Sequence, residues 1–184
     1  MAAYAKLLFL LAITIYFKDG NGFGNIFSCP KSPVIKDFSP QKYKGVWYEY
    51  QRFNNFLQIN TTCISYRYCP RKNGDMKVTY NRLEQGVFDE TSKGTLVNVM
   101  GKPNHFNLFL DNITGLEQNV LFTDYKKYAV LYGCDDSTKL EWAFILSRER
   151  QPKISPRKER CLHRYLTNLG GNTSLLVTSD QTNC

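Results

Sequence analysis

The sequence predicts an all-β protein, an eight-stranded antiparallel up-and-down barrel with one C-terminal α-helix packed against its outside. Short runs rich in β-branched and aromatic residues follow one another along most of the chain, and Gly, Pro, Asn or Asp bounds each run. Aromatic residues, which strands favour, are abundant, with 12 Tyr, 12 Phe and 2 Trp. A series of short strands closes into a barrel because closure removes the exposed edges of the sheet.

The first predicted strand covers residues 44 to 53 and follows an extended, proline-containing arm. Gly45 lies at its start, where the backbone must turn or approach another segment closely. The second strand covers residues 62 to 69, and Pro70 ends it because proline cannot donate a ladder hydrogen bond. Asn73-Gly74 is a strong signal for a hairpin, so the second and third strands are expected to pair antiparallel.

The remaining strands are expected at short intervals, over residues 76–83, 91–100, 105–112, 119–124, 127–134 and 140–147. A helix is expected to begin at Ser155-Pro156, with serine as the N-cap and proline at the first helical position. Gly170-Gly171 ends it. Its apolar face, which should pack on the barrel wall, consists of Leu162, Tyr165, Leu166 and Leu169. A last strand, residues 174–178, is expected beside the first.

The N-terminal segment is predicted to be a signal peptide. Lys6 precedes an apolar run over residues 7–17 that is too short to span a bilayer but suits the core of a secretory leader. We therefore expect a signal peptide over residues 1–22, with cleavage between residues 20 and 24, and a single domain over residues 23–184.

Three glycosylation sequons also indicate an extracellular protein, and they begin at Asn60, Asn112 and Asn172. The last residues, 179–184, carry no hydrophobic tail, so a glycolipid anchor is not expected. The protein is therefore expected to be secreted.

The formal net charge of +8 bears on the partners of the protein. Such a charge can draw a protein to lipid particles or to an anionic membrane surface, or it can simply form a solvated face that maintains solubility. No stretch of the sequence interleaves this charge with base-stacking aromatic residues, so nucleic acid is not an expected partner.

Two distant segments are predicted to meet at the closed end of the barrel. Trp47 lies near the start of the first strand, and a late apolar strand over residues 141–147 leads to Arg148, whose guanidinium could lie over the indole face. Three blocks resemble the signature blocks of the lipocalins in order and spacing: Gly45-Val46-Trp47, residues 123–130 and residues 145–148. Further residues resemble the apolipoprotein D branch, which includes the insect bilin-binding proteins. They are Cys29-Pro30, residues 42–49, Cys63-Ile64 and residues 132–134. This resemblance covers nearly all of the chain after the first two dozen residues.

Six cysteines in an exported chain suggest disulfides, and sequence alone permits many pairings. The resemblance implies that Cys29 pairs with Cys134 and that Cys63 pairs with Cys184. Two cysteines are left, Cys69 and Cys161. They could form a third bridge, since Cys161 is expected on the apolar side of the helix, or they could be free thiols.

The interior of a barrel is formed by side chains that alternate inward along each strand. Counting by twos from the signature positions gives an apolar and aromatic lining, the usual composition of a small-molecule pocket. The inward set is Tyr66, Tyr68, Met76, Val78, Tyr80, Leu108, Leu110, Trp142, Phe144 and Leu146. Arg148 and Trp47 should form the closed floor.

The residues expected to contact a ligand are Tyr43, Tyr66, Tyr68, Val78, Tyr80, Leu108, Leu110, Phe144 and Leu146. For Tyr43, Tyr68, Tyr80, Leu110 and Phe144 the resemblance implies this role. The others follow from the inward count, whereas Trp47, Arg148, Trp142 and Met76 are interpreted as barrel core. Relatives often have asparagine at the position of Tyr80, and here Asn81 lies one residue further on, so a slip of one residue would exchange the two.

The resemblance implies a non-catalytic carrier for a fatty acid, a sterol-like lipid, a retinoid or a bilin, with no cofactor apart from bilin as a possible bound ligand. No catalytic or phosphate-binding motif is present in the sequence. His105 and His163 are too few and too far apart for a metal site, and His105 is expected to be a surface imidazole. The alternative function is an extracellular protein-interaction module that uses loops at the barrel mouth, such as Asn54 to Asn60.

Overall fold

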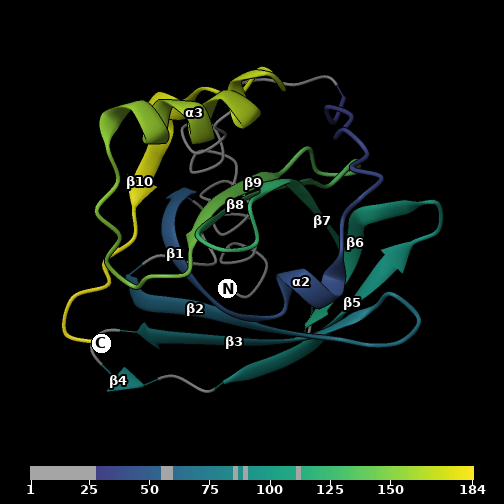
Figure 1. Cartoon of the computed structure of the whole chain (residues 1–184), viewed down its shortest axis with the longest axis horizontal. Coiled ribbons are helices and arrows are strands. Elements are labelled where there is room, and N and C mark those ends of the chain that lie inside the picture. The colour runs from purple at the N-terminus through teal and green to yellow at the C-terminus, as the bar shows by residue number, and fades with distance from the viewer. Residues whose placement is uncertain (1–27, 55–59, 85–86, 89–90, 111–112) are drawn as a thin grey trace, which may run out of the picture.

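The computed structural model describes residues 28–54, 60–84, 87–88, 91–110 and 113–184 (Figure 1). The predicted signal peptide, residues 1–22, lies outside this part of the chain. Within the described residues, no helix is long and apolar enough to cross a membrane.

Eight antiparallel strands form a closed barrel, as the sequence predicts. In chain order they are β1 (Gly45–Phe53), β2 (Thr61–Pro70), β3 (Met76–Glu84), β5 (Ser92–Val99), β6 (Lys102–Leu110), β7 (Ile113–Thr123), β8 (Tyr128–Cys134) and β9 (Glu141–Ser147). Each strand pairs with the next, and β9 pairs with β1 to close the barrel. Two short strands add to it, since β4 (Val87–Phe88) pairs with β3 and β10 (Leu176–Thr178) pairs with β1.

Three elements differ from the predicted boundaries. Strand β7 begins at Ile113 rather than at residue 119. Gly115, which resembles a turn residue in the sequence, lies within the strand with φ +74°. The strand continues through it because the register with β6 shifts between Leu108 and Phe109. The arm before β1 is not extended throughout, because Ser39 caps the one-turn helix α2 (Pro40–Tyr43). The first residues of the predicted last strand form the 3₁₀ turn η2 (Thr173–Leu175).

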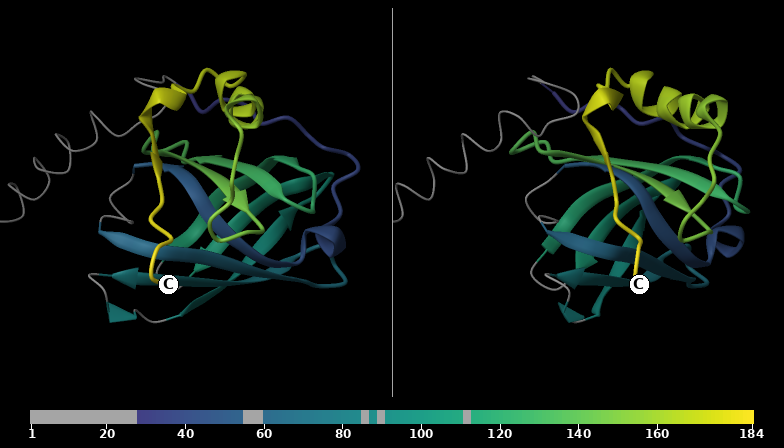
Figure 2. Two further views of the ribbon diagram at one scale, coloured as in Figure 1. Left: turned by 60° about the vertical axis from the view of Figure 1, so that its left-hand side comes forward. Right: turned by 90° about the vertical axis from the view of Figure 1, so that its left-hand side faces the viewer.

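The helix α3 (Pro156–Thr167) begins at its predicted Ser155 cap and lies across the outside of the barrel (Figures 1 and 2). It buries Leu162 and Leu166 against a cluster that includes Val130 of β8 and Ile145 of β9. These two strands therefore have buried side chains on both faces, which explains why their sequences read as continuous apolar runs.

The C-terminal tail completes the wall between β1 and β2. Strand β1 pairs with β2 only from Gly45 to Tyr48, and its later residues pair with β10. Beyond β10, the backbone N–H of Ser179 donates to the carbonyl oxygen of Tyr50 at 2.9 Å. The amide of Gln181 then bridges the two strands by donating to the carbonyl oxygens of Glu49 and Ile64. Figure 2 shows the tail running along the side of the barrel.

Candidate functional site

The floor of the barrel is built around the predicted pair of Arg148 and Trp47. The guanidinium carbon of Arg148 lies 3.8 Å from the centre of the indole ring. Its nitrogens donate to the carbonyl oxygens of Val46 at 2.7 Å and Lys44 at 2.9 Å. The Nε1 of Trp47 donates to the carbonyl oxygen of Tyr43 at 2.9 Å. The late strand is thus locked to the start of the first strand, and this end of the barrel is closed.

The register of the strands places the predicted ligand residues on the inner face. Tyr66 lies opposite both Trp47 and Tyr80, while Tyr68 lies opposite Val78. Asn81 lies opposite Ser65 on the outer face and bonds to it, so Tyr80 rather than Asn81 points inward.

The other strands continue the same inner face. Leu110 pairs with Gly94, Leu108 pairs with the interior residue Leu96, and Phe144 and Leu146 join the cluster that contains Trp47. Tyr43 reaches this cluster from α2 and stacks on Trp47 with ring centres 5.0 Å apart. The role of these side chains in binding a ligand stays a prediction.

Solvent exposure increases along the inner face from the floor toward the opposite end. Near the floor, Tyr43, Trp47, Tyr68 and Met76 are at most 1% exposed. Further up, Tyr80 is still buried, but five other inward-facing side chains are only half-buried, and these are Tyr66, Leu108, Leu110, Trp142 and Phe144. The barrel therefore has a tightly packed floor and an accessible upper interior.

Gly133 makes room for the indole of Trp142 on this upper wall. The two residues pair across β8 and β9, and a Cβ atom at position 133 would lie 2.1 Å from the indole nitrogen and 1.9 Å from the carbonyl oxygen of Glu117. A side chain at this position would displace Trp142 from the lining.

Two phenol hydroxyls are buried near the floor, and they differ in their partners. The hydroxyl of Tyr68 accepts a hydrogen bond from the Gln118 amide at 3.2 Å. The hydroxyl of Tyr43 has no hydrogen-bond partner among the described residues. Burial raises the pKa of both phenols well above the usual value, so both stay protonated at neutral pH. Tyr43 therefore offers a free donor and acceptor in an otherwise apolar environment, where an unpaired polar group is costly.

A buried polar cluster on the wall was not predicted from the sequence. Glu49 is fully buried, and its carboxylate accepts hydrogen bonds from Tyr66 at 2.8 Å, Ser179 at 2.6 Å and Arg52 at 3.0 Å. Glu49 could have been found by counting two residues from Trp47. Arg52 could not, because a register shift between Glu49 and Gln51 reverses the alternation. The two opposite charges compensate each other, so this pair adds no net charge to the wall.

Both disulfides implied by the resemblance are present. Cys29 is bonded to Cys134, and Cys63 to Cys184. The possible third bridge is wrong, because the remaining two cysteines are free and exposed. Cys161 directly precedes the buried Leu162 and is turned about 100° from it around the helix axis, which takes its thiol off the packed face. Cys69 lies exposed on β2.

His105 is not the surface imidazole that we expected, since it is only 4% exposed, and burial lowers its pKa. Its Nε2 lies 3.3 Å from the carbonyl oxygen of Pro33. Within the described residues, no group of three or more His, Cys, Asp or Glu side chains could hold a metal ion.

Other predicted features remain open. Asn60 and Asn172 are exposed, while Asn112 lies outside the described residues. Residues 55–59 also lie outside them, so the alternative of a loop-mediated interaction stays a prediction.

The chain is similar in sequence to proteins of known identity. No protein-family model matches the chain. Apolipoprotein D of Rattus norvegicus is 28% identical over 190 residues, which cover 100% of this chain and 98% of that protein. The crustacyanin-A1 subunit of Homarus gammarus is 30% identical over 131 residues, which cover 68% of this chain and 71% of that protein.

Solved structures share the fold. Lobster apocrustacyanin A1 has a TM-score of 0.69 at 23% identity, over 86% of this chain and 93% of that one. Insecticyanin from the tobacco hornworm Manduca sexta has a TM-score of 0.68 at 21% identity, over 83% of this chain and 85% of that one. With the signature pair at its floor and these relatives in sequence and structure, the chain belongs to the lipocalin family, in its apolipoprotein D-like branch.

Proposed function

We propose that the protein is a secreted, non-catalytic carrier that encloses a small hydrophobic ligand in its barrel. The observation that carries this proposal is the graded inner face, which is apolar and aromatic, fully packed at the floor and half-buried above it. A ligand seated on the upper lining would lose its contact with water, at about 25 cal/mol per Å² before the costs of binding are subtracted. Membership of a family of carriers supports the same function.

The expected ligands are a fatty acid, a sterol-like lipid, a retinoid or a bilin, with bilin as a ligand rather than a catalytic cofactor. Each has a long or flat apolar body and few polar groups, which suits a lining of aromatic and aliphatic side chains with scattered hydroxyls. That relatives bear the name apolipoprotein supports a lipid among these classes.

The proposal includes secretion and exchange of the ligand at lipid particles or at an anionic membrane surface. Two disulfides support an oxidising compartment, since cytosolic thiols are kept reduced. The apolar leader and the exposed sequon residues Asn60 and Asn172 support export and glycosylation. The formal net charge of +8 supports attraction to an anionic surface.

Titration with a fatty acid, a sterol, a retinoid and biliverdin, followed by quenching of tryptophan fluorescence, tests the proposal. Native mass and visible absorbance of the purified protein would reveal a ligand retained from the host. Leu108→Trp fills the upper interior, and we expect it to lower affinity at least about tenfold by steric exclusion. Val97→Trp adds the same side chain one strand away on the outer face, and it should leave affinity unchanged. Absence of binding to all four ligands, or equal losses in both variants, would contradict the proposal.

A further inference from the structure

The outer face of β2, β3 and β5 carries three exposed cations, Arg67, Lys77 and Lys93, which we call the basic wall. Arg67 and Lys93 both lie opposite Thr79, from its two sides. Lys77 lies two residues before Thr79 on the same face and is therefore the diagonal neighbour of both cations. Diagonal neighbours in a sheet are about 7–8 Å apart, close enough for like charges to repel.

No described residue of the barrel wall neutralises these charges. Among the described residues, none of the three cations forms an ion pair or a side-chain hydrogen bond. Their described cross-strand neighbours on this face, such as Thr79 and Thr95, are uncharged. Asp75, in the hairpin between β2 and β3, is engaged elsewhere, since its carboxylate accepts from the Asn98 N–H at 2.9 Å and from Asn73 at 2.7 Å. An external anion would relieve the repulsion between the cations.

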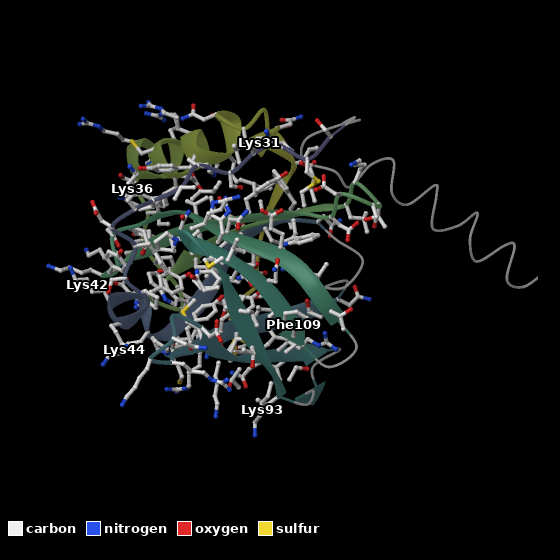
Figure 3. All side chains as sticks on the ribbon, turned by 90° about the vertical axis from the view of Figure 1, so that its right-hand side faces the viewer. Lys31, Lys36, Lys42, Lys44, Lys93 and Phe109 are labelled. Carbon is white, nitrogen blue, oxygen red and sulfur yellow. A yellow bond between two sulfur atoms is a disulfide. The ribbon has the colours of Figure 1, made fainter. Side chains whose placement is uncertain are left out.

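Exposed apolar side chains lie beside the basic wall. Phe109 is 43% exposed and lies opposite Thr95, the residue that pairs with Lys77 on its other side. Val97, 39% exposed, is two residues further along β5. Figure 3 shows Lys93 and Phe109 on the side of the molecule formed by β5 and β6. Positive charge interspersed with exposed aromatic and aliphatic groups is typical of surfaces that bind the headgroup region of a membrane.

A hollow of about 250 Å³ adjoins the basic wall on the side of the barrel mouth. Its lining includes Ser65, Asn81 and Arg150. Ser65 precedes Arg67 by two residues on the same face of β2 and pairs with Asn81, so the hollow directly follows the row of cations. The guanidinium of Arg150 is fixed at its border by stacking on Tyr48, with a centroid distance of 4.6 Å. A hydroxyl, an amide and a guanidinium are suitable donors for a phosphate oxygen.

We propose that the basic wall docks the protein on membrane surfaces that contain anionic phospholipids. Arg67, Lys77 and Lys93 face the headgroup phosphates, Phe109 enters the interfacial layer, and the hollow beside Arg150 accommodates a headgroup. A lipid surface fits better than a sulfated polysaccharide because apolar side chains lie exposed beside the cations. This inference rests on the proposed carrier function, since it specifies the surface at which ligand is exchanged.

The helix α3 provides a matched control on the opposite side of the barrel (Figure 1). It also carries three exposed cations, Arg157, Arg160 and Arg164. In contrast to the basic wall, α3 contains an acidic residue among its cations, Glu159. Its Lys158 is engaged with the rings of Phe122 and Tyr128. Replacing the three exposed cations of either set by glutamine lowers the net charge of the protein by the same amount.

The test is co-sedimentation of the purified protein with phosphatidylcholine vesicles that contain phosphatidylserine, beside vesicles of phosphatidylcholine alone. We expect binding only to the anionic vesicles, weakening as salt is added. Each cation near such a surface contributes about fivefold to affinity, so Arg67→Gln, Lys77→Gln and Lys93→Gln together should lower it roughly a hundredfold. The α3 set should lower it only a few fold. Phe109→Ser, which changes no charge, should lower it about tenfold.

Fluorescence titration of a fatty acid, run on the same proteins, separates this inference from the carrier function. We expect both sets of glutamine variants to keep wild-type affinity for the ligand in the barrel. Equal losses of vesicle binding in the two sets would overturn the docking proposal. Ligand binding without vesicle binding in the wild type would overturn it too and leave the carrier function intact. Vesicle binding without ligand binding would support the basic wall and contradict the carrier function.

Discussion

The guanidinium of Arg148 lies 3.8 Å above the ring of Trp47, although the two residues come from opposite ends of the barrel sequence. The ladder between β1 and β9 begins only at Tyr48 and Ser147, so below that pair the backbone no longer joins the strands. Side chains replace the ladder there, through the stacked ring and the hydrogen bonds of Arg148 to Val46 and Lys44. One arginine thus joins the end of β9 to the start of β1 at the floor.

Replacing Arg148 by lysine should lower the free energy of unfolding by about 2–3 kcal/mol, since an ammonium cannot make the planar stack and the forked hydrogen bonds together. Urea unfolding followed by tryptophan fluorescence measures this effect. Arg157→Lys, on the exposed first turn of α3, is the control and should change the free energy by less than about 0.5 kcal/mol. An unfolding midpoint of Arg148→Lys equal to the wild type would show that the floor does not depend on the fork.

Tyr43→Phe should have opposite effects on stability and on binding. It removes a buried hydroxyl that has no partner among the described residues, so the ligand-free protein should gain about 0.5–1 kcal/mol. A ligand with a hydroxyl or carbonyl group that reaches the floor should lose affinity roughly five- to tenfold. The two measurements are thermal unfolding without ligand and titration with a sterol. Tyr68→Phe is the contrast, because it leaves the Gln118 amide unpaired and should destabilise the protein.

Glu141 should make the protein less stable as the pH rises from 4.5 to about 7. Burial raises the pKa of its carboxyl from 4.5 to about 7, although the hydrogen bond from Tyr132 acts in the other direction. Between these values the folded state retains a proton that the unfolded chain has released, so stability falls with pH, and the loss is complete above the folded pKa. Glu141→Gln keeps an acceptor for Tyr132 and should remove a difference on the order of 2 kcal/mol.

Urea midpoints of wild type and Glu141→Gln at a series of pH values from acid to slightly alkaline test this expectation. The two curves should converge at acid pH and separate at neutral pH, with the variant more stable. Parallel curves would show that Glu141 is ionised in both states throughout.

The thiols should divide into two classes. Titration with a thiol reagent in denaturant should find two free thiols per chain, those of Cys69 and Cys161, and reduction should release those of the two disulfides. Cys184→Ser should cost about 3 kcal/mol, because it frees a long loop and detaches the tail that holds Glu49. Cys161→Ser is the matched control, and we expect no change in its unfolding midpoint. A count of zero free thiols would restore the third bridge.

Most of the fold could be predicted from the sequence because its signals are local. Period-two alternation and the Asn73-Gly74 turn mark the strands, and Ser155-Pro156 marks the start of α3. The start of β7 was missed because Gly115 resembles a turn residue, whereas tertiary pairing with β6 keeps it within a strand. The β-propensity of single residues does not indicate which strands will pair.

The inner face was predictable for the same reason, up to the point where alternation fails. The register that places Tyr80 inward follows from simple counting. Arg52 lies beyond a register shift, and Ser179 belongs to a tail that is distant in sequence, so no period could identify either. Cys161 was expected on the apolar side of the helix but is exposed. A shift of the helix face by one residue decides between the two, and a hydrophobic pattern does not define the face that closely.

The contribution of the C-terminal tail to the wall has a kinetic consequence. Strand β1 lies early in the chain, but its later residues pair with β10 and the segment after it, which follow all the other strands. Until β10 has paired with it, this edge of β1 can recruit other chains, as unpaired strands do in folding intermediates. The disulfides, which span 105 and 121 residues, also close late. Folding is therefore dominated by distant contacts and should be slow.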